Sequence, residues 1–309
     1  MKLKLLLLVI VFSGFIKAQT AEEFDALSLQ KEESGDIKGA LKAIEKAIAL
    51  DSLTTDYFDT KGYYLFKLEK YEAAYVAYTK AISIKQNAFS YNGRAYVLET
   101  IREFSLAIKD YTMAINSADT DTMKYMEYSN RGSAKMKIRD FAGAYDDLMK
   151  AYLFDSTSIG VLTNLGAVCD ETGRGDETLK YLLKAVEVDS NFYPAYGNIG
   201  FKYQEMGDHK KAIEYFDKVL SFNPNEPLGY SNRSFNLYKL GDLKAALKDI
   251  DESIKLYPGN SYAYRIKALI YFEQGKTKKG CENIQIALDY GFTAMYGDEV
   301  VKLQNEKCK

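Results

Sequence analysis

The chain has 309 residues, of which 47% are hydrophobic and 27% are charged, a composition typical of folded proteins and not of disordered ones. Lys and Arg number 41 and Asp and Glu number 43, so the formal net charge is −2, which argues against a nucleic-acid partner. Because a single core rarely grows beyond about 250–300 residues, this length favours two domains or a repeat array.

The first eighteen residues predict a secretory signal peptide. Lys2 and Lys4 form a basic start, residues 5–16 are an apolar stretch, and Ala18 is a small residue that permits cleavage before Gln19. The apolar stretch is shorter than the roughly 20 residues that cross a bilayer core, so a membrane anchor fits less well. We expect cleavage near Ala18, an exported chain in the periplasm, on the cell surface or secreted, and no membrane span in the mature chain.

A period of 34 residues runs through the rest of the chain. One series of small residues follows it at Gly166, Gly200, Ser234 and Ala268, and a second at Gly173, Gly207, Gly241 and Gly275. Extended towards the N-terminus, the period predicts about eight repeats: 21–54, 55–87, 88–121, 125–158, 159–192, 193–226, 227–260 and 261–294. One longer step leaves residues 122–124 between the third and fourth repeats.

Each repeat predicts two helices. In residues 193–226, apolar side chains recur at spacings of three and four, first at Tyr196, Ile199, Tyr203 and Met206 and then at Ala212, Ile213, Phe216, Val219 and Leu220. Gly207 separates the two runs, Asp208 is placed to cap the second helix, and Pro224 follows its end. Such a hairpin buries its apolar face only by stacking on its neighbours.

The repeats resemble those of the tetratricopeptide repeat (TPR) family, whose pattern is W-x2-L-G-x2-Y…A-x3-F…P. The residues at these positions in 193–226 are Tyr196, Ile199, Gly200, Tyr203, Ala212, Phe216 and Pro224. The position of the usual Trp is taken by Phe24, Phe58, Tyr91, Tyr128, Leu162, Tyr196, Tyr230 and Tyr264. The resemblance covers residues 21–294 and implies an all-α, right-handed superhelical solenoid. In this family the first helix of each repeat lines a concave groove that binds a peptide or a partner's helix.

The resemblance also implies which side chains face the groove: those one residue after the small position, those three residues before that, and some further along the same face. The resulting candidate partner-binding residues are Tyr63, Tyr96, Asn130, Asn164, Asn198, Phe201, Asn232, Phe235 and Tyr238. Amide side chains both donate and accept hydrogen bonds, which suits an extended peptide backbone, and aromatic side chains can cover a partner's side chains. The alternative for the Asn residues is that they belong to the common repeat pattern and support helix packing.

Charged residues indicate the kind of partner. Some family members bind a C-terminal carboxylate with basic groove residues, but the matching positions here include Asp25 and Asp59, and Arg265 is the only basic one. Acidic residues near the N-terminal end of the groove predict a basic partner there: Glu22, Asp25, Glu32, Glu33, Asp56 and Asp59. The sequence therefore predicts an exported protein-interaction scaffold for a protein or peptide partner. The alternative is a binder of a small molecule or glycan in the tyrosine-rich groove.

Catalysis has little support in the sequence. No nucleophile-elbow, phosphate-loop or dinucleotide-binding motif occurs. His209 is the only histidine, and it follows Asp208 in the turn between two predicted helices, where we expect it to be solvated. A lone histidine does not make a metal site. We therefore expect no catalytic residues, no cofactor and no metal.

The three cysteines differ in their surroundings. Cys169 stands at a core position, which predicts a buried free thiol. Residues 295–309 predict a closing helix that turns back along the last repeat. Counted from a turn near residue 293, Cys281 and Cys308 lie at similar heights, within about 4–5 Å along the helix axis. An exported chain meets oxidising conditions, so a disulfide between these two is expected; two unrelated thiols are the alternative.

Overall fold

The computed structural model of the protein describes residues 20–308, all of which lie in helices and their connections. The predicted signal peptide, residues 1–18, lies outside this range. The chain divides between Ile138 and Arg139 into two compact units, called here the N-terminal and C-terminal units. Within residues 20–308, no helix is both long and apolar enough to span a membrane.

Two helices fall within each predicted repeat. The first helices are α1 (Ala21–Glu33), α3 (Thr55–Lys67), α5 (Ala88–Thr100), α7 (Asp121–Lys137), α9 (Ile159–Glu171), α11 (Tyr193–Glu205), α13 (Pro227–Lys239) and α15 (Ser261–Glu273). The second helices are α2 (Ile37–Leu50), α4 (Tyr71–Ile84), α6 (Phe104–Ser117), α8 (Phe141–Phe154), α10 (Gly175–Val188), α12 (His209–Phe222), α14 (Leu243–Leu256) and α16 (Thr277–Asp289). Helices α17 (Phe292–Tyr296) and α18 (Glu299–Lys307) follow the last repeat.

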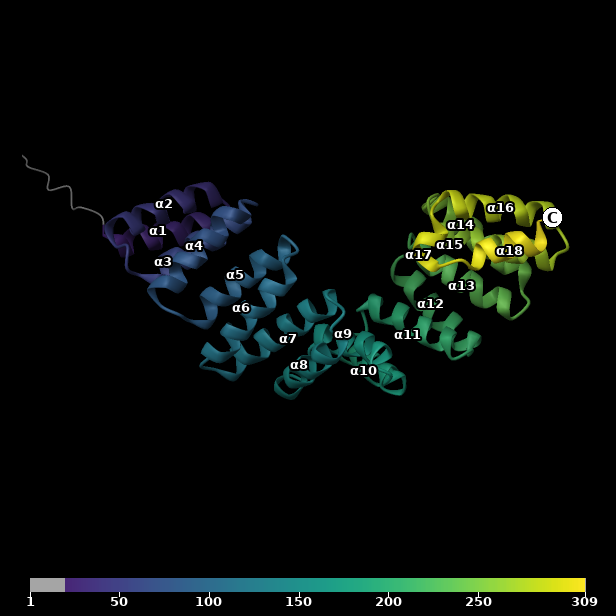
Figure 1. Ribbon diagram of the computed structural model, residues 1–309, viewed down its shortest axis with the longest axis horizontal. Coiled ribbons are helices and arrows are strands. Elements are labelled where there is room, and N and C mark those ends of the chain that lie inside the picture. The colour runs from purple at the N-terminus through teal and green to yellow at the C-terminus, as the bar shows by residue number, and fades with distance from the viewer. Residues whose placement is uncertain (1–19, 309) are drawn as a thin grey trace, which may run out of the picture. The chain divides into compact units, whose positions relative to one another are not determined.

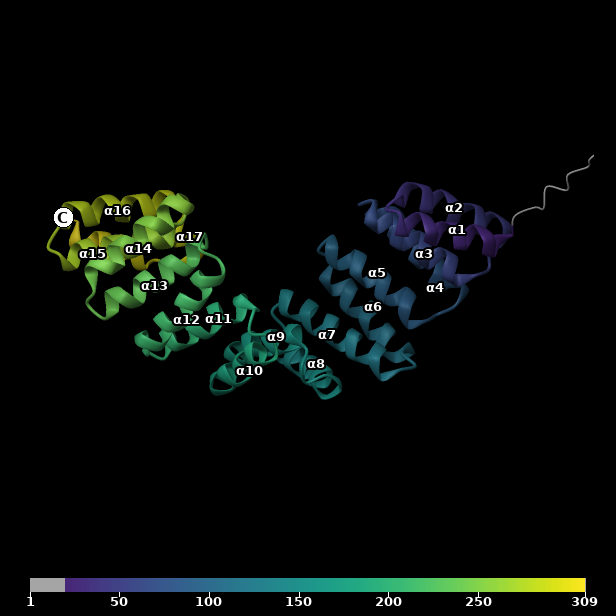
Figure 2. The ribbon, with the colours of Figure 1, turned by 180° about the vertical axis from the view of Figure 1, so that it is seen from behind.

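Within each unit the helices stack as successive hairpins (Figures 1 and 2). Inside a unit, each helix packs against the next one in the chain. Neighbouring first helices also touch: α3 contacts α5 and α5 contacts α7, while α11 contacts α13 and α13 contacts α15. Small residues permit this close approach. A Cβ atom added at Gly166 would lie 2.8 Å from Leu182, and one added at Gly200 would lie 3.0 Å from the Phe216 ring. The all-α solenoid predicted from the repeats is thus confirmed within each unit.

The turn between the two helices of each predicted repeat contains a residue with positive φ. Among residues 20–308 this residue is Gly35, Gly173, Gly207, Gly241 or Gly275 in five repeats, and Glu69, Arg102 or Arg139 in the other three. Glycine adopts this left-handed conformation without steric cost, which explains the second glycine series of the sequence. The predicted cap also forms, because the Asp208 side chain accepts a hydrogen bond of 3.2 Å from the Lys211 backbone N–H.

Residues 122–124 do not form a linker between the third and fourth repeats. They lie inside α7, which has 17 residues where the other first helices have 13. The helix begins after Thr120, whose hydroxyl accepts a hydrogen bond of 3.2 Å from the Met123 backbone N–H. The insertion therefore lengthens the first helix at its N-terminal end.

The end of the chain closes the C-terminal unit. Val300 in α18 and Phe292 in α17 are buried, and they pack against Ala268, Ile284 and Ala287 of the last repeat. The closing helix is shorter than residues 295–309, because Gly297 has a φ of +83° and separates α17 from α18. Helices α17 and α18 thus cover apolar surface of the last hairpin, as the next repeat does for the hairpins before it.

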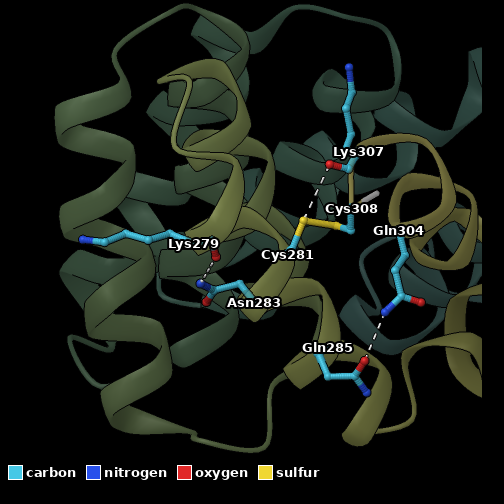
Figure 3. Close-up of a disulfide and its surroundings, with 7 residues drawn as sticks. All are labelled: Lys279, Cys281, Asn283, Gln285, Gln304, Lys307 and Cys308. Carbon is cyan, nitrogen blue, oxygen red and sulfur yellow. Dashed lines mark hydrogen bonds between the residues drawn. A yellow bond between two sulfur atoms is a disulfide. The ribbon is translucent and has the colours of Figure 1, made fainter.

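A disulfide joins α16 to the end of α18 (Figure 3). The bond links Cys281 to Cys308, whose Cα atoms lie 5.6 Å apart. About one helical turn away from the disulfide, the Gln304 amide donates a hydrogen bond of 3.0 Å to the Gln285 side-chain oxygen. Cys169, by contrast, is a buried free cysteine, as the sequence predicts. The disulfide and the amide pair hold the closing helix against the last repeat.

Reducing this disulfide should destabilise the C-terminal end. The bond closes a loop of 27 residues, for which the chain-entropy model gives a contribution of about 3.5 kcal/mol. We expect the Cys308→Ser variant to unfold at a lower urea concentration than the wild type, and dithiothreitol to shift only the wild type. Equal urea midpoints for the oxidised wild type and the variant would contradict this role.

Candidate functional site

A hollow of about 400 Å³ lies between the first helices α11 and α13 of the C-terminal unit. Tyr193, Asn198 and Phe201 of α11 and Leu228 and Asn232 of α13 line its walls, with Phe216 and Val219 of α12 beneath them. Phe201 is 47% exposed and Asn198 is also exposed. Three of the predicted groove residues, Asn198, Phe201 and Asn232, therefore share one hollow. Its walls are apolar, with two amide groups and the Glu226 carboxylate among them.

The N-terminal unit has an aromatic hollow of about 250 Å³ between its first helices α3 and α5. The predicted groove residues Tyr63 and Tyr96 both line it, together with Phe66, Tyr78 and Phe89. The rings of Phe66 and Tyr96 lie 5.1 Å apart, and the Lys67 ammonium lies 5.1 Å from the centre of the Tyr63 ring. This hollow, here called the aromatic hollow, offers a mostly apolar surface that is partly open to solvent.

A hollow of about 440 Å³ adjoins the aromatic hollow along α3 and α5, and Phe89 lines both. Asp59 lies in its wall and is only 3% exposed, and its Oδ2 accepts a hydrogen bond of 2.9 Å from the Ser90 hydroxyl. Burial raises the pKa of Asp59 to about 7, the nearby Asp56 adds to this, and the Ser90 hydrogen bond partly offsets it. We call this hollow the acidic hollow.

The pairing of Asp59 with Ser90 recurs one repeat later. There Asn92 of α5 takes the place of Asp59, and its amide donates a hydrogen bond of 2.6 Å to Glu127 of α7. Glu127 is also buried, and burial raises its pKa to about 7 despite this hydrogen bond. The N-terminal unit thus buries two carboxyl groups along its first helices.

The remaining predicted groove residues do not join these hollows. Asn130 lies on α7 in the N-terminal unit, whereas Asn164 lies on α9 in the C-terminal unit, and both are half-buried. Tyr238 lines a separate hollow of about 320 Å³ with Lys239, Leu243 and Glu273. Of the four aligned Asn residues, Asn198 and Asn232 line the 400 Å³ hollow together, and Asn130 and Asn164 line none of these hollows.

Phe235, a predicted groove residue, is more deeply packed than Phe201. It is half-buried and packs against the core formed by α13, α14 and α15. The Arg265 guanidinium lies 5.6 Å from the centre of its ring, and the His209 ring meets it edge-on with centroids 6.4 Å apart. A substitution of Phe235 would therefore disturb the packing of this core as well as change the groove surface.

His209 is not a solvated turn residue. It is the first residue of α12, it is half-buried, and its Nδ1 lies 2.8 Å from the side-chain oxygen of Asn236 in α13. Asn236 in turn donates a hydrogen bond of 2.7 Å to the Gln204 side chain of α11. The prediction failed because the partner comes from the next repeat, which the local sequence does not indicate. This amide network links the two repeats that form the 400 Å³ hollow.

An ion-pair fork that was not predicted from the sequence links neighbouring repeats. The Arg233 guanidinium binds both carboxylate oxygens of Asp249 at 2.6 and 2.8 Å and reaches Asp217 of the preceding repeat at 2.7 Å. Arg94 repeats the arrangement with Asp110 at 2.7 and 2.8 Å and with Thr79 at 3.1 Å. The available signal was an Arg directly before the small position with an Asp 16 residues later.

Two further kinds of binding chemistry concern the described part of the chain, metal coordination and a basic clamp. Residues 20–308 contain no group of three His, Cys, Asp or Glu side chains arranged to hold a metal ion. Arg265, the basic residue at a clamp position, is paired with Glu299 of the closing helix at 2.5 Å. Its guanidinium is therefore engaged within the fold.

Comparison with known proteins agrees with this architecture. Family models described as tetratricopeptide repeat match residues 56–87, 193–226 and 236–279. A TPR repeat-containing protein of Methanocaldococcus jannaschii is 35% identical over a segment that covers 46% of this chain and 32% of that protein. The chain thus spans about a third of the length of this curated relative.

Solved structures share the fold at low sequence identity. The C-terminal part of a TPR repeat-containing protein from Cytophaga hutchinsonii is 21% identical with a TM-score of 0.61, covering 80% of this chain and 99% of that one. PilF of Pseudomonas aeruginosa is 20% identical with a TM-score of 0.59, covering 69% and 96%. YrrB, described as a TPR protein with an unusual peptide-binding site, is 23% identical with a TM-score of 0.53, covering 62% and 97%.

Proposed function

We propose that this chain, which contains tetratricopeptide repeats in both of its units, is an exported protein-interaction scaffold. Its first helices bind an extended peptide or a helix of a partner protein. Tetratricopeptide repeats typically mediate protein–protein interactions, and stacked repeats provide extended surfaces for this purpose. The basic start and apolar stretch of residues 1–18 support export to a periplasm or cell surface.

The observation that carries the proposal is the 400 Å³ hollow between α11 and α13. Its apolar walls can bury a partner side chain, while Asn198 and Asn232 offer donors and acceptors to a peptide backbone. Phe201 remains 47% exposed beside them, although a large aromatic side chain gains free energy by leaving water. An aromatic anchor beside amide groups is the composition expected of an interface hot spot.

The double variant Asn198→Ala with Phe201→Ala should weaken partner binding without unfolding the protein. Removing one aromatic anchor costs about 2 kcal/mol, or about a thirtyfold increase in Kd. The partner is first isolated by affinity capture from the envelope fraction, and its affinity is then measured for each variant. The matched control changes two exposed lysines of second helices, Lys210→Ala with Lys248→Ala, and should leave Kd within about twofold. Loss of binding in the control alone would contradict binding at the first helices.

Binding of a small molecule or glycan is the second candidate, and the aromatic hollow beside Tyr63 and Tyr96 favours it. Free sugars or small lipids would then displace the bound material, whereas peptides would not. Competition by peptides alone supports the scaffold, and competition by sugars or lipids alone supports the second candidate.

A further inference from the structure

The acidic hollow contains a buried carboxyl oxygen without a partner. Asp59 Oδ2 is bonded to Ser90, but its Oδ1 has no hydrogen-bond partner among the residues that the structure describes. Buried polar atoms are nearly always hydrogen-bonded, so an unpaired one in the wall of a hollow calls for an explanation. A ligand that donates hydrogen bonds to Asp59 would provide it.

The charges around the hollow favour a cationic ligand. Asp56 of α3 lines the same hollow and raises the pKa of Asp59 through its negative charge. Asp25 of α1 lies near enough to Asp56 for its own pKa to be raised, after the larger effect of burial. Among the described residues that line the hollow, Lys85 is the one cation, and it is exposed, so water and salt screen its charge. Tyr78 of α4 packs nearby, and its pKa is raised, chiefly by burial.

This acidity is not a property that every repeat shares. In the equivalent hollow between α11 and α13, the position of Asp59 is occupied by Gly197, and the walls carry the amides of Asn198 and Asn232. That hollow has a carboxyl group in its lining as well, but it belongs to Glu226, which is half-buried and accepts a hydrogen bond of 3.3 Å from the Leu228 backbone N–H. The carboxyl group of the acidic hollow differs because it is buried and has an oxygen that is unpaired among the described residues.

The aromatic hollow continues the acidic hollow on the other side of Phe89. Phe89 is 62% exposed and lines both hollows. Gly93 keeps the space open, because a Cβ atom there would lie 2.3 Å from the Tyr78 ring. A carboxyl subsite and an aromatic subsite thus stand next to each other along the same two helices.

We propose that the acidic hollow binds a lysine or arginine side chain of the partner, and that the aromatic hollow binds a bulky apolar side chain next to it. The proposal rests on the function proposed above and names the chemistry that the N-terminal unit recognises. A charge-assisted hydrogen bond from the ligand satisfies Asp59 Oδ1, and Asp56 adds electrostatic attraction. The aromatic side chains of the neighbouring hollow supply apolar contact area, and the faces of their rings attract a cation.

Binding is coupled to proton release from Asp59. Burial holds the pKa of Asp59 at about 7 in the free protein, so a large share of the molecules carry a proton there at neutral pH. A cationic ligand favours the charged carboxylate and therefore expels this proton. Affinity for a basic peptide increases as the pH rises from 6 to 8.

A library of random dodecapeptides displayed on phage tests the proposal on the full mature chain. Selections are run in parallel on the wild type, on Asp59→Asn and on the control Glu72→Gln, whose exposed side chain lies on α4 outside both hollows. Circular dichroism verifies the fold of each variant. We expect the wild type and the control to enrich peptides with Lys or Arg beside an aromatic or large aliphatic residue, and Asp59→Asn not to.

A synthetic peptide with the enriched sequence then provides the affinity. Its Kd should increase about tenfold for Asp59→Asn, and also when Glu or norleucine replaces its basic residue. The wild-type Kd should fall from pH 6 to pH 8, and the Kd for Asp59→Asn should not. Enriched peptides that lack a basic residue, or that bind Asp59→Asn equally well, overturn this inference but leave the proposed function intact. A selection that enriches no peptide on any protein overturns both.

Discussion

Replacing Arg233 with methionine should lower the free energy of unfolding by about 3–5 kcal/mol. The Asp249 carboxylate is only 6% exposed, and Arg233 is its bidentate partner at 2.6 and 2.8 Å. Removing the guanidinium leaves a buried negative charge without compensation and also breaks the link to Asp217 of the preceding repeat. Urea unfolding followed by circular dichroism measures the change.

Two control variants separate this effect from a general loss of charge. Lys255→Met removes an exposed ion pair with Glu252 and should change the free energy of unfolding by less than about 1 kcal/mol. Adding Asp249→Leu to Arg233→Met removes the uncompensated charge and should restore most of the loss. If Arg233→Met were as mild as Lys255→Met, the fork would not be a stabilising link between repeats.

The protein should become less stable as the pH rises from about 4 to about 7. Burial raises the pKa values of Asp59 and Glu127 to about 7, so the folded state keeps protons that the unfolded chain loses above about pH 4. Folding is therefore favoured below the unfolded pKa, and this advantage disappears as the pH approaches the folded pKa. For Asp59 alone the shift corresponds to about 4 kcal/mol.

The double variant Asp59→Asn with Glu127→Gln isolates this contribution. Its free energy of unfolding should change much less between pH 5 and pH 8, and at pH 8 it should exceed that of the wild type. Exposed acids such as Asp36 and Asp51 have lowered pKa values, chiefly because of side-chain hydrogen bonds from Lys31 and Thr54, and so act in the opposite direction. The stability that these exposed acids contribute is lost only as the pH falls below about 4. Parallel pH profiles for the wild type and the variant would show that the two carboxyl groups are not the cause.

The repeat spacing was sufficient to predict the helices and their turns. Gly207 and Asp208 indicated a turn and a cap, and both occur at those residues, because turn conformation and capping depend on neighbouring residues in the chain. The small residue at Gly200 likewise indicated close packing of helices. The turn, the cap and the small residue recur every 34 residues, so the pattern of one repeat supports the helix prediction for the next.

The side-chain environment of the site could be predicted only in part. The groove positions of Asn198, Phe201 and Asn232 follow from the repeat pattern, and these residues do line one hollow. Phe235 occupies the same repeat position as Phe201 but is packed beside Arg265, a residue of the following repeat. His209 is held by Asn236 of the following repeat in the same way. Contacts between repeats depend on pairs of residues that the period of a single series does not reveal.

The repeat period also did not predict the lengths of two helices, α7 and α18. Residues 122–124 extend α7 because Thr120, and not a later residue, caps the helix. Gly297 divides the closing segment because its positive φ interrupts helical geometry. In both cases one residue with a specific backbone role decides the boundary, while the apolar pattern on either side continues.

Site-specific photocrosslinking tests the central claim, binding of a protein or peptide partner along the first helices, most directly. A benzophenone amino acid replaces Phe201 in the hollow between α11 and α13, or Lys248 on the second helix α14, and cells that produce each variant are irradiated. The account predicts a covalent adduct with a partner protein from position 201 and none from position 248. An adduct from position 248 together with none from position 201 would contradict it.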